Sequence, residues 1–167
     1  MTREAFIRQV TPLLTPLRRF LLGLCGGDRM RSEDLSQETL VKAYLAMDSY
    51  EARGGCQFST WLFKIAYNLF LDDVRRFRYD CADMDEASGV AIPASEGADG
   101  GFRYEALYRA LDRLESTQKA VILMFYINGC SVKEVALALD LPEGTVKSHL
   151  SRGRQRLGQM LQDDNDR

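Results

Sequence analysis

Residues 131–156 read SVKEVALALDLPEGTVKSHLSRGRQR, and this stretch decides the fold of the C-terminal part of the chain. Ser131 and Glu134 have the Ser-x-x-Glu spacing of a capping box, which marks the start of a helix. The Asp-Leu-Pro-Glu run that begins at Asp140 is typical of a turn, because proline cannot continue the preceding helix. Helical spacing resumes over residues 143–161. The pattern therefore predicts two helices joined by a tight turn.

From Gly144 on, the second helix of this pair carries only basic charge. Residues 144–162 contain no acidic side chain, and their basic residues are Lys147, Arg152, Arg154 and Arg156. A cationic helix held across a partner helix is a common device for reading the major groove of DNA. The alternative is a solvated basic face on an ordinary helical hairpin.

Helical geometry predicts which side chains of this pair face inward and which face outward. Apolar positions of the two helices would bury against each other: Val135, Ala136 and Leu139 on the first, and Val146, Leu150 and Leu157 on the second. The outward positions of the second helix are then Lys147, Ser148, Ser151, Arg152 and Gln155. Small residues at 144, 148, 151 and 153 would leave room for a duplex. His149 could contact DNA or simply fill the helix.

Composition excludes several classes of protein. The 167 residues are 46% hydrophobic, which is enough for a packed core, but no apolar run is long enough to span a bilayer. The start of the chain lacks the pattern of a signal peptide, so we expect a cytoplasmic protein. The four cysteines are far apart and His149 is the single histidine, so we expect no metal, no cofactor and reduced thiols.

Charge and composition predict where the chain divides. The net charge is −2, yet residues 81–101 hold five acidic side chains and no basic one, so the remainder is close to balance. Phosphate binding depends on local charge, so the net value does not argue against a nucleic-acid partner. Residues 81–101 are rich in Asp, Glu, Gly, Ala and Ser without clear periodicity, which predicts a flexible linker. We place a domain over residues 1–80, a second over 102–162 and a fraying tail at 163–167.

Almost every other segment has helical periodicity, so the predicted fold is all-α, with two small helical domains. The first helix should cover about residues 3–24, with a kink or a late start caused by Pro12 and Pro16. Ser32 is the expected N-cap of a second helix that reaches about Met47. The further helices are expected at residues 61–78, capped by Ser59 or Thr60, and at 104–114 and 116–128.

Two other clusters could carry function. Between Tyr50 and Arg78, several aromatic residues lie close in sequence to cations, a combination that suits stacking on single-stranded bases. The alternative, which this segment alone favours, is that the aromatic rings belong to the core. Residues 33–44 are rich in acidic and amide side chains and could form a docking face, although composition alone favours a plain solvated surface.

Three of these stretches, in this order, resemble the extracytoplasmic-function sigma factors of bacterial RNA polymerase: residues 33–44, 58–76 and 141–154. The resemblance implies a first domain that docks on the clamp helices of the largest polymerase subunit and recognises and melts the minus-ten element. It implies a second domain that reads the minus-thirty-five element. The implied partners are core RNA polymerase, including its flap, promoter DNA and an anti-sigma factor.

The resemblance also implies roles for individual residues. It gives polymerase contacts at Asp34, Gln37 and Glu38, and minus-ten contacts at Phe58, Ser59, Thr60, Trp61, Lys64 and Asn68. It gives minus-thirty-five contacts at Thr145, Lys147, Ser148, His149, Ser151, Arg152 and Arg154. Two positions depart from the family pattern, because His149 stands where arginine is usual and Gly153 where alanine is common.

Two rival functions differ in class. One is a regulator that binds its operator without polymerase, which the C-terminal motif alone would support. The other is a phosphotransfer or hydrolytic enzyme, which would need a nucleotide loop, a metal cluster or several histidines. We therefore expect a transcription initiation factor and not an enzyme.

Overall fold

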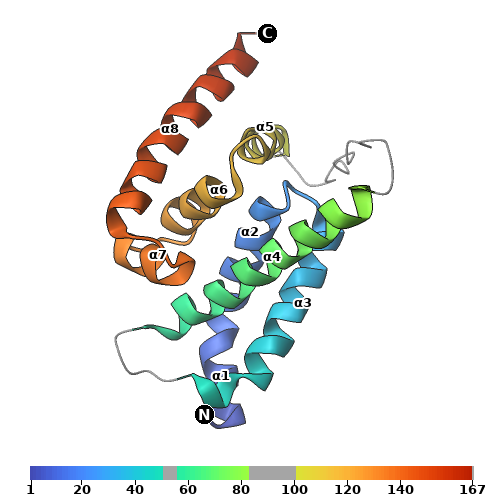
Figure 1. Cartoon of the computed structure of the whole chain (residues 1–167), viewed down its shortest axis with the longest axis vertical. Helices are drawn as coiled ribbons and strands as arrows, with labels where there is room; N and C mark the ends of the chain where they lie inside the picture. The colour runs from blue at the N-terminus through green and yellow to red at the C-terminus, as the bar shows by residue number, and fades with distance from the viewer. Residues whose placement is uncertain (51–55, 83–100, 167) are drawn as a thin grey trace.

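The computed structural model describes residues 1–50, 56–82 and 101–166, and all regular elements in these residues are helical (Figure 1). The all-α prediction is confirmed. The N-terminal half consists of α1 (Arg3–Val10), η1 (Thr11–Leu13), α2 (Leu14–Leu24), α3 (Arg29–Leu45), η2 (Met47–Ser49) and α4 (Phe58–Ala82). The C-terminal half consists of α5 (Gly101–Asp112), α6 (Ser116–Ile122), η3 (Leu123–Ile127), α7 (Val132–Leu139) and α8 (Glu143–Asn165).

Proline interrupts the first helical segment. Pro12 lies in η1, the short 3-10 turn that separates α1 from α2. A proline inside a helix removes a backbone donor and clashes with the preceding turn, so the α-helix breaks there. Pro16 lies in the first turn of α2, where backbone N–H groups have no intrahelical partner in any case. The predicted kink is therefore confirmed.

The helix α3 begins earlier than predicted. The side chain of Asp28 accepts a hydrogen bond from the backbone N–H of Arg31 at 3.2 Å, so Asp28 is the N-cap. Ser32 lies buried inside the helix, where its hydroxyl donates to the carbonyl of Arg29. The prediction that Ser32 caps this helix is wrong, because aspartate and serine are equally good caps and the sequence offers both within four residues.

Two other helix ends also differ from the prediction. The helix α4 begins at Phe58, which places Ser59 and Thr60 inside its first turn and not at its cap. The helix α8 continues to Asn165, so residues 163–165 are helical where a frayed tail was expected. Helix ends fray, and their last turns vary in geometry. A sequence pattern therefore predicts where a helix begins or ends less reliably than it predicts the helix itself.

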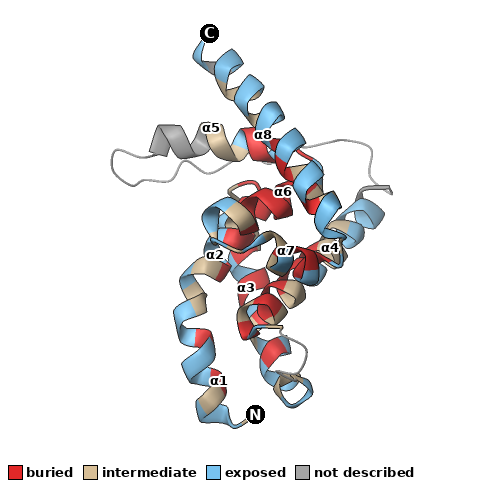
Figure 2. Ribbon diagram, turned by 90° about the vertical axis from the view of Figure 1, so that its left-hand side faces the viewer, coloured by how far each residue is buried: buried red, intermediate tan, exposed pale blue. Residues whose placement is uncertain are grey.

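An apolar cluster of described residues joins the two halves. Phe20 of α2 and Phe70 of α4 belong to the same cluster of buried side chains as Leu111 and Leu123 of the C-terminal half. The helix α2 packs against α5, α6 and η3, and α4 packs against α7. Buried residues gather where α2, α4, α6 and α7 meet (Figure 2). The two halves therefore touch directly, while most of the predicted linker, residues 83–100, lies outside the described residues.

Candidate nucleic-acid interface

The predicted helix-turn-helix is present, and its first helix is fixed at both ends. The backbone N–H of Glu134 donates to the Ser131 hydroxyl at 3.1 Å, and the Glu134 carboxylate accepts from the Ser131 N–H at 2.7 Å. At the other end Asp140 adopts a left-handed backbone with φ 54°, which ends α7. The N–H of Leu141 then donates to the carbonyl of Ala136 at 3.0 Å. This turn fixes the direction in which α8 leaves α7.

The inward face of the helix pair matches the predicted core. Val135 and Val146 are completely buried, and Ala136, Leu139 and Leu150 are each at most 8% exposed. Leu157, further along α8, is half-buried. Burial of these side chains leaves the opposite face of α8 to solvent.

The outward face of α8 carries the predicted basic and hydroxyl side chains. All five positions predicted to face outward are exposed: Lys147, Ser148, Ser151, Arg152 and Gln155. Thr145 and His149 are half-buried beside this face. The Nδ1 atom of His149 is buried and has no hydrogen-bond partner among the described residues. The sequence prediction of a cationic surface on this helix is therefore confirmed, with His149 at its margin.

Arg154 and Gly153 lie away from the centre of this face. Arg154 is exposed but lines an apolar cavity that α8 forms with α5, α6 and η3. Gly153 is buried, and a β-carbon there would collide with the side chain of Ile122. The prediction that Gly153 leaves room for a duplex is wrong, because the space beside it belongs to α6.

An aromatic cluster packs around the start of α4. The ring of Phe58 lies edge to face with those of Phe6 and Tyr50, at centroid distances of 5.8 and 5.4 Å. Trp61 packs against both Tyr50 and Phe58. Phe58 is 5% exposed and Thr60 is 3% exposed. In this conformation neither side chain can reach DNA, and the core interpretation holds for Phe58.

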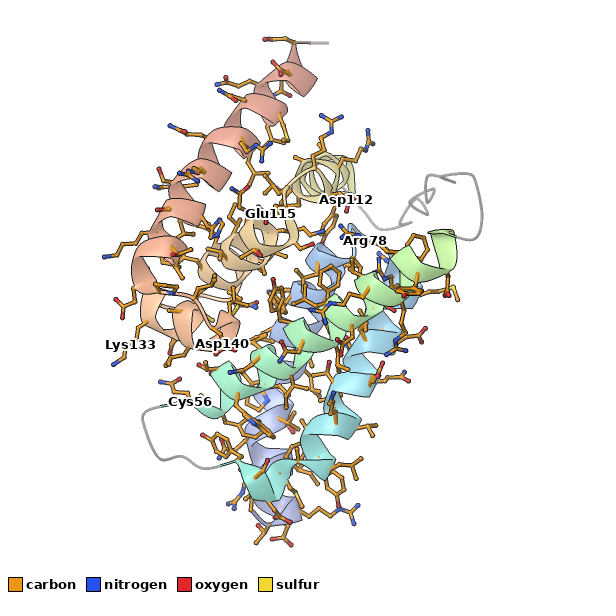
Figure 3. The ribbon with its side chains drawn as sticks, viewed as in Figure 1. Cys56, Arg78, Asp112, Glu115, Lys133 and Asp140 are labelled. Atoms are coloured by element: carbon orange, nitrogen blue, oxygen red, sulfur yellow. The ribbon has the colours of Figure 1, made fainter. Side chains whose placement is uncertain are left out.

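The other four predicted minus-ten contacts reach the surface of α4. Ser59 and Trp61 are half-buried, and Asn68 is exposed. Lys64 is half-buried, and its Nζ donates to Oδ1 of Asp140 at 2.8 Å. Figure 3 shows Asp140 on the turn between α7 and α8, beside the first turns of α4. The structure thus brings a predicted DNA contact of one half against the turn of the other.

The outer face of α3 is polar with apolar neighbours. Asp34, Gln37 and Glu38 are all exposed, and one further turn along the same side Val41 is 59% exposed. Leu45, four residues beyond Val41, is 78% exposed. Acidic, amide and aliphatic groups on one exposed helix face suit a protein partner, since large exposed apolar side chains are costly in water. The predicted docking face is therefore exposed. Val41 and Leu45 add apolar surface to it that the prediction, based on acidic and amide residues, did not include.

An aromatic residue of α3 lies close to this face. Tyr44 is 41% exposed, and its ring forms a T-shaped pair with that of Phe6 at a centroid distance of 5.6 Å. Tyr44 also lines a shallow apolar depression between α1 and α3. Its position adds aromatic surface near the docking face of α3.

A buried lysine joins the two halves, and the sequence pattern did not reveal it. Lys119 of α6 is 5% exposed, and its Nζ donates to the backbone carbonyl of Leu24 at 2.7 Å. The same ammonium lies 5.6 Å from the ring centroid of Phe70 and 3.5 Å from Oδ1 of Asp112. Burial lowers the pKa of Lys119, and the Asp112 carboxylate partly opposes that shift. The one signal in the sequence is a cation directly before the apolar run that begins at Ala120.

Comparison with known proteins identifies the family. The family described as Sigma-70 region 2 matches residues 9–78, and the family described as Sigma-70, region 4 matches residues 104–157. The ECF RNA polymerase sigma factor EcfG of Rhodopseudomonas palustris (strain TIE-1) is 32% identical over 145 residues, covering 87% of this chain and 78% of the relative. The chain belongs to the extracytoplasmic-function sigma factors. SigW of Bacillus subtilis (strain 168) is 31% identical to this sigma factor over 149 residues, which cover 82% and 79% of the two chains.

Solved structures support the same assignment. The sigma factor RpoE of Bartonella quintana, solved with the anti-sigma factor NepR, aligns with a TM-score of 0.83 at 30% identity and covers 95% of this chain and 98% of its own. CnrH, solved with the cytosolic domain of CnrY, shares the fold with a TM-score of 0.72. As a sigma factor, the chain directs core RNA polymerase to promoters for transcription initiation, so core polymerase and promoter DNA are its partners. Among its described residues, none of the helices has the length and apolarity needed to cross a membrane.

Proposed function

We propose that this sigma factor reads promoter DNA with two separate surfaces. Residues 102–162 bind the minus-thirty-five element as a duplex, and residues 1–80 recognise and melt the minus-ten element. Residues 81–101 connect the two domains. In this proposal the protein works in the cytoplasm and catalyses no reaction of its own.

The exposed basic face of α8 is the observation that carries the proposal. Lys147 and Arg152 are exposed on this face, beside the hydroxyls of Ser148 and Ser151. Val146 and Leu150, on the opposite side of α8, are buried in the core. Arginine and lysine bind guanine edges and phosphates, and serine reaches either. A net charge of −2 does not oppose this, because residues 144–162 carry four basic side chains and no acidic one.

The unpaired minus-ten strand is proposed to bind along α4. Trp61, Lys64 and Asn68 share one side of this helix by their spacing. An indole ring can stack on a base, an ammonium can hold a phosphate, and an amide can pair with a base edge. A cavity of about 440 Å³ opens beside Ser59, lined also by Gln9, Pro12, Leu13, Gln57 and Phe58. It could accept an extruded base, with the buried Phe58 shaping its wall.

Two surfaces are proposed for polymerase. Asp34, Gln37 and Glu38 would contact the clamp helices of the largest subunit, with Val41 and Leu45 adding apolar contact on the same face of α3. The flap would dock at the apolar cavity of about 310 Å³ in the C-terminal half, which is lined by Leu107, Leu111, Ile122, Leu123, Tyr126, Ile127, Arg154 and Leu157. Tyr126 and Ile127 are 49% and 42% exposed, so apolar area is already presented to a partner.

An anti-sigma factor is proposed as the inhibitor. The relative from Bartonella quintana was solved with such a factor, and its alignment extends over both halves of this chain. Purification of the protein from its native host through a tag at one end, followed by mass spectrometry, should recover a small protein in a fixed ratio. Recovery of core polymerase subunits alone at every growth stage would argue against an anti-sigma factor.

An electrophoretic mobility-shift assay tests whether specific DNA binding by this protein requires core polymerase. The lone protein and the protein with core polymerase are each titrated onto the fragment upstream of a gene under its control at physiological salt. We expect sharp, specific complexes only with core polymerase, because the overall charge gives the free chain little affinity for DNA. Sharp, specific binding by the lone protein would instead favour a regulator that acts without polymerase.

A further inference from the structure

The helix-turn-helix lies against part of the surface proposed for the minus-ten strand, at Lys64. The helix α7 packs against α4. Figure 3 shows the turn residue Asp140 close to the first turns of α4. The Lys64 ammonium donates to Asp140 Oδ1 at 2.8 Å, across a separation of 76 residues in sequence. A side chain proposed to hold DNA is thus already bound to a carboxylate of the same chain.

Asp140 occupies a backbone position that does not require an acid. Among the described residues it is the single non-glycine residue with a positive φ. Glycine and asparagine adopt this left-handed conformation at least as readily as aspartate, so the turn itself needs no carboxylate. A carboxylate oxygen is an anionic acceptor, as a phosphate oxygen is, and an ammonium binds either as a point charge. The acid therefore imitates the ligand that Lys64 is proposed to bind.

The ion pair alone is too weak to keep the halves together. The side chains of Lys64 and Asp140 are 40% and 72% exposed, and ion pairs with this exposure contribute little net stability. Closure therefore depends on the buried contacts deeper in the same interface. The role of Asp140 is to decide which ligand Lys64 holds while the halves are closed.

Close packing of α2 against η3 supplies one of the buried contacts. Gly23 is buried, and a β-carbon built on it would lie 2.6 Å from Cδ2 and 2.8 Å from Cδ1 of Leu123. Leu123 is completely buried, so it has little room to move aside. Glycine at position 23 is thus a requirement of the closed arrangement and not of the helix, in which alanine would be the better residue.

Lys119 supplies the second buried contact and makes closure reversible. Its ammonium satisfies the carbonyl of Leu24 near the C-terminal end of α2, a position that favours a cation. Burying a cation also carries a large desolvation cost, which is returned when the halves separate and Lys119 meets water. A contact of this kind specifies one arrangement of the two halves without stabilising it strongly. Binding of polymerase or DNA can therefore open the closed form.

We propose that this sigma factor inhibits itself, because Asp140 of its C-terminal half occupies the phosphate position on Lys64 whenever the two halves close through Gly23–Leu123 and Lys119–Leu24. The inference rests on the proposed role of Lys64 in holding the minus-ten strand. Opening of this contact precedes promoter melting. If about nine chains in ten are closed, full opening lowers the concentration of protein needed for melting about tenfold.

Small-angle X-ray scattering of the 167-residue chain alone tests closure. Gly23→Ala places a methyl group against Leu123 and should increase the radius of gyration relative to the unchanged chain. Gly158→Ala is the matched control, because nothing lies within 4 Å of a β-carbon at that position of α8. A lone unchanged protein already as extended as Gly23→Ala would contradict self-closure.

Promoter melting with core polymerase tests occlusion of Lys64. Asp140→Asn removes the charge and keeps a residue that suits the left-handed turn. Asp163→Asn makes the same change of charge near the other end of α8. We expect Asp140→Asn and Gly23→Ala to reach half-maximal permanganate reactivity at several-fold lower concentration than the unchanged chain and Asp163→Asn. Equal concentrations for all four proteins would overturn the proposal.

The two readouts separate this inference from the proposed function. If no form of the protein melts a promoter with core polymerase, the proposed function fails and occlusion of Lys64 fails with it. Scattering would still decide whether the halves close. If Gly23→Ala expands the protein but Asp140→Asn melts no better than Asp163→Asn, Lys64 is not masked and the inference is rejected while the proposed function stands.

Discussion

The side chain of Ile122 occupies the space beside Gly153 where a β-carbon would lie, so any other residue at position 153 requires Ile122 to move. Gly153→Ala should therefore destabilise the protein by about 1–3 kcal/mol, because both positions are buried and the added methyl forces a repacking. Urea unfolding followed by circular dichroism measures the change.

The control for this substitution lies on the same helix. A β-carbon at Gly158 would have no neighbouring atom within 4 Å, so Gly158→Ala should stabilise α8 by about 0.5–1 kcal/mol through helix propensity. An equal gain from Gly153→Ala would show that Ile122 does not restrict position 153.

The Cys25 thiol makes stability depend on pH in the alkaline range. Burial raises the pKa of Cys25 from 9.0 to about 12, while the nearby Arg31 charge lowers it by less and the Asp28 charge raises it further. A thiol that stays protonated in the folded state contributes stability below the unfolded pKa and loses it as pH rises from 9 toward 12. Between about pH 8 and about pH 10 this loss should be about 1 kcal/mol.

Cys25→Ala isolates that contribution. The variant should show a smaller fall in the free energy of unfolding between these two pH values than the unchanged protein does. Lys119 acts in the opposite direction, since its lowered pKa relieves a cost as pH rises toward 10.5, and it is present in both proteins. Parallel pH profiles for the two proteins would show that the Cys25 thiol does not titrate differently on unfolding.

Arg152 is the most direct test of the α8 surface. If its guanidinium contacts a base, Arg152→Ala should weaken promoter binding by the polymerase complex by about 1–3 kcal/mol and relax specificity at one position of the minus-thirty-five element. Arg156→Ala removes the same charge from an exposed position of α8 that is not among the proposed contacts. Titration of promoter fragments with the reconstituted complex measures both. Equal effects of the two variants would reduce Arg152 to a general electrostatic role.

Asn68 separates binding of the promoter from its opening. It is exposed one turn beyond Lys64 on α4, so Asn68→Ala should leave duplex binding nearly unchanged and reduce melting of the minus-ten element. Permanganate footprinting of unpaired thymines reports the open complex, and Asn165→Ala at the end of α8 is a control for loss of an exposed amide. Normal opening in Asn68→Ala would remove Asn68 from the proposed site.

The parts of the fold that the sequence predicts well are those set by neighbouring residues. The capping box of Ser131 and Glu134, the proline after Leu141 and the apolar spacing around Val146 define the helix-turn-helix without any tertiary information. The exposed basic face of α8 follows from the same spacing. Helix starts were less certain, because Asp28 and Ser32 offer the same capping chemistry four residues apart.

Contacts between the halves could not be predicted from the sequence. Lys119 meets Leu24 across 95 residues and Lys64 meets Asp140 across 76, and no local pattern encodes such pairs. The role of Gly153 could not be predicted either. A small residue there is compatible with a nearby DNA duplex or with a closely packed helix, and only the position of Ile122 in the fold shows that the helix is the reason. Tertiary packing, which single-sequence periodicity does not contain, determines all three.

Run-off transcription with purified core RNA polymerase tests the central claim most directly. Genomic fragments, including the region upstream of the gene for this protein, serve as templates with core polymerase alone and with core polymerase plus the full chain. We predict discrete transcripts from a small set of fragments that require the added chain and that weaken with Arg152→Ala. A complete lack of chain-dependent transcripts from every fragment would contradict the account.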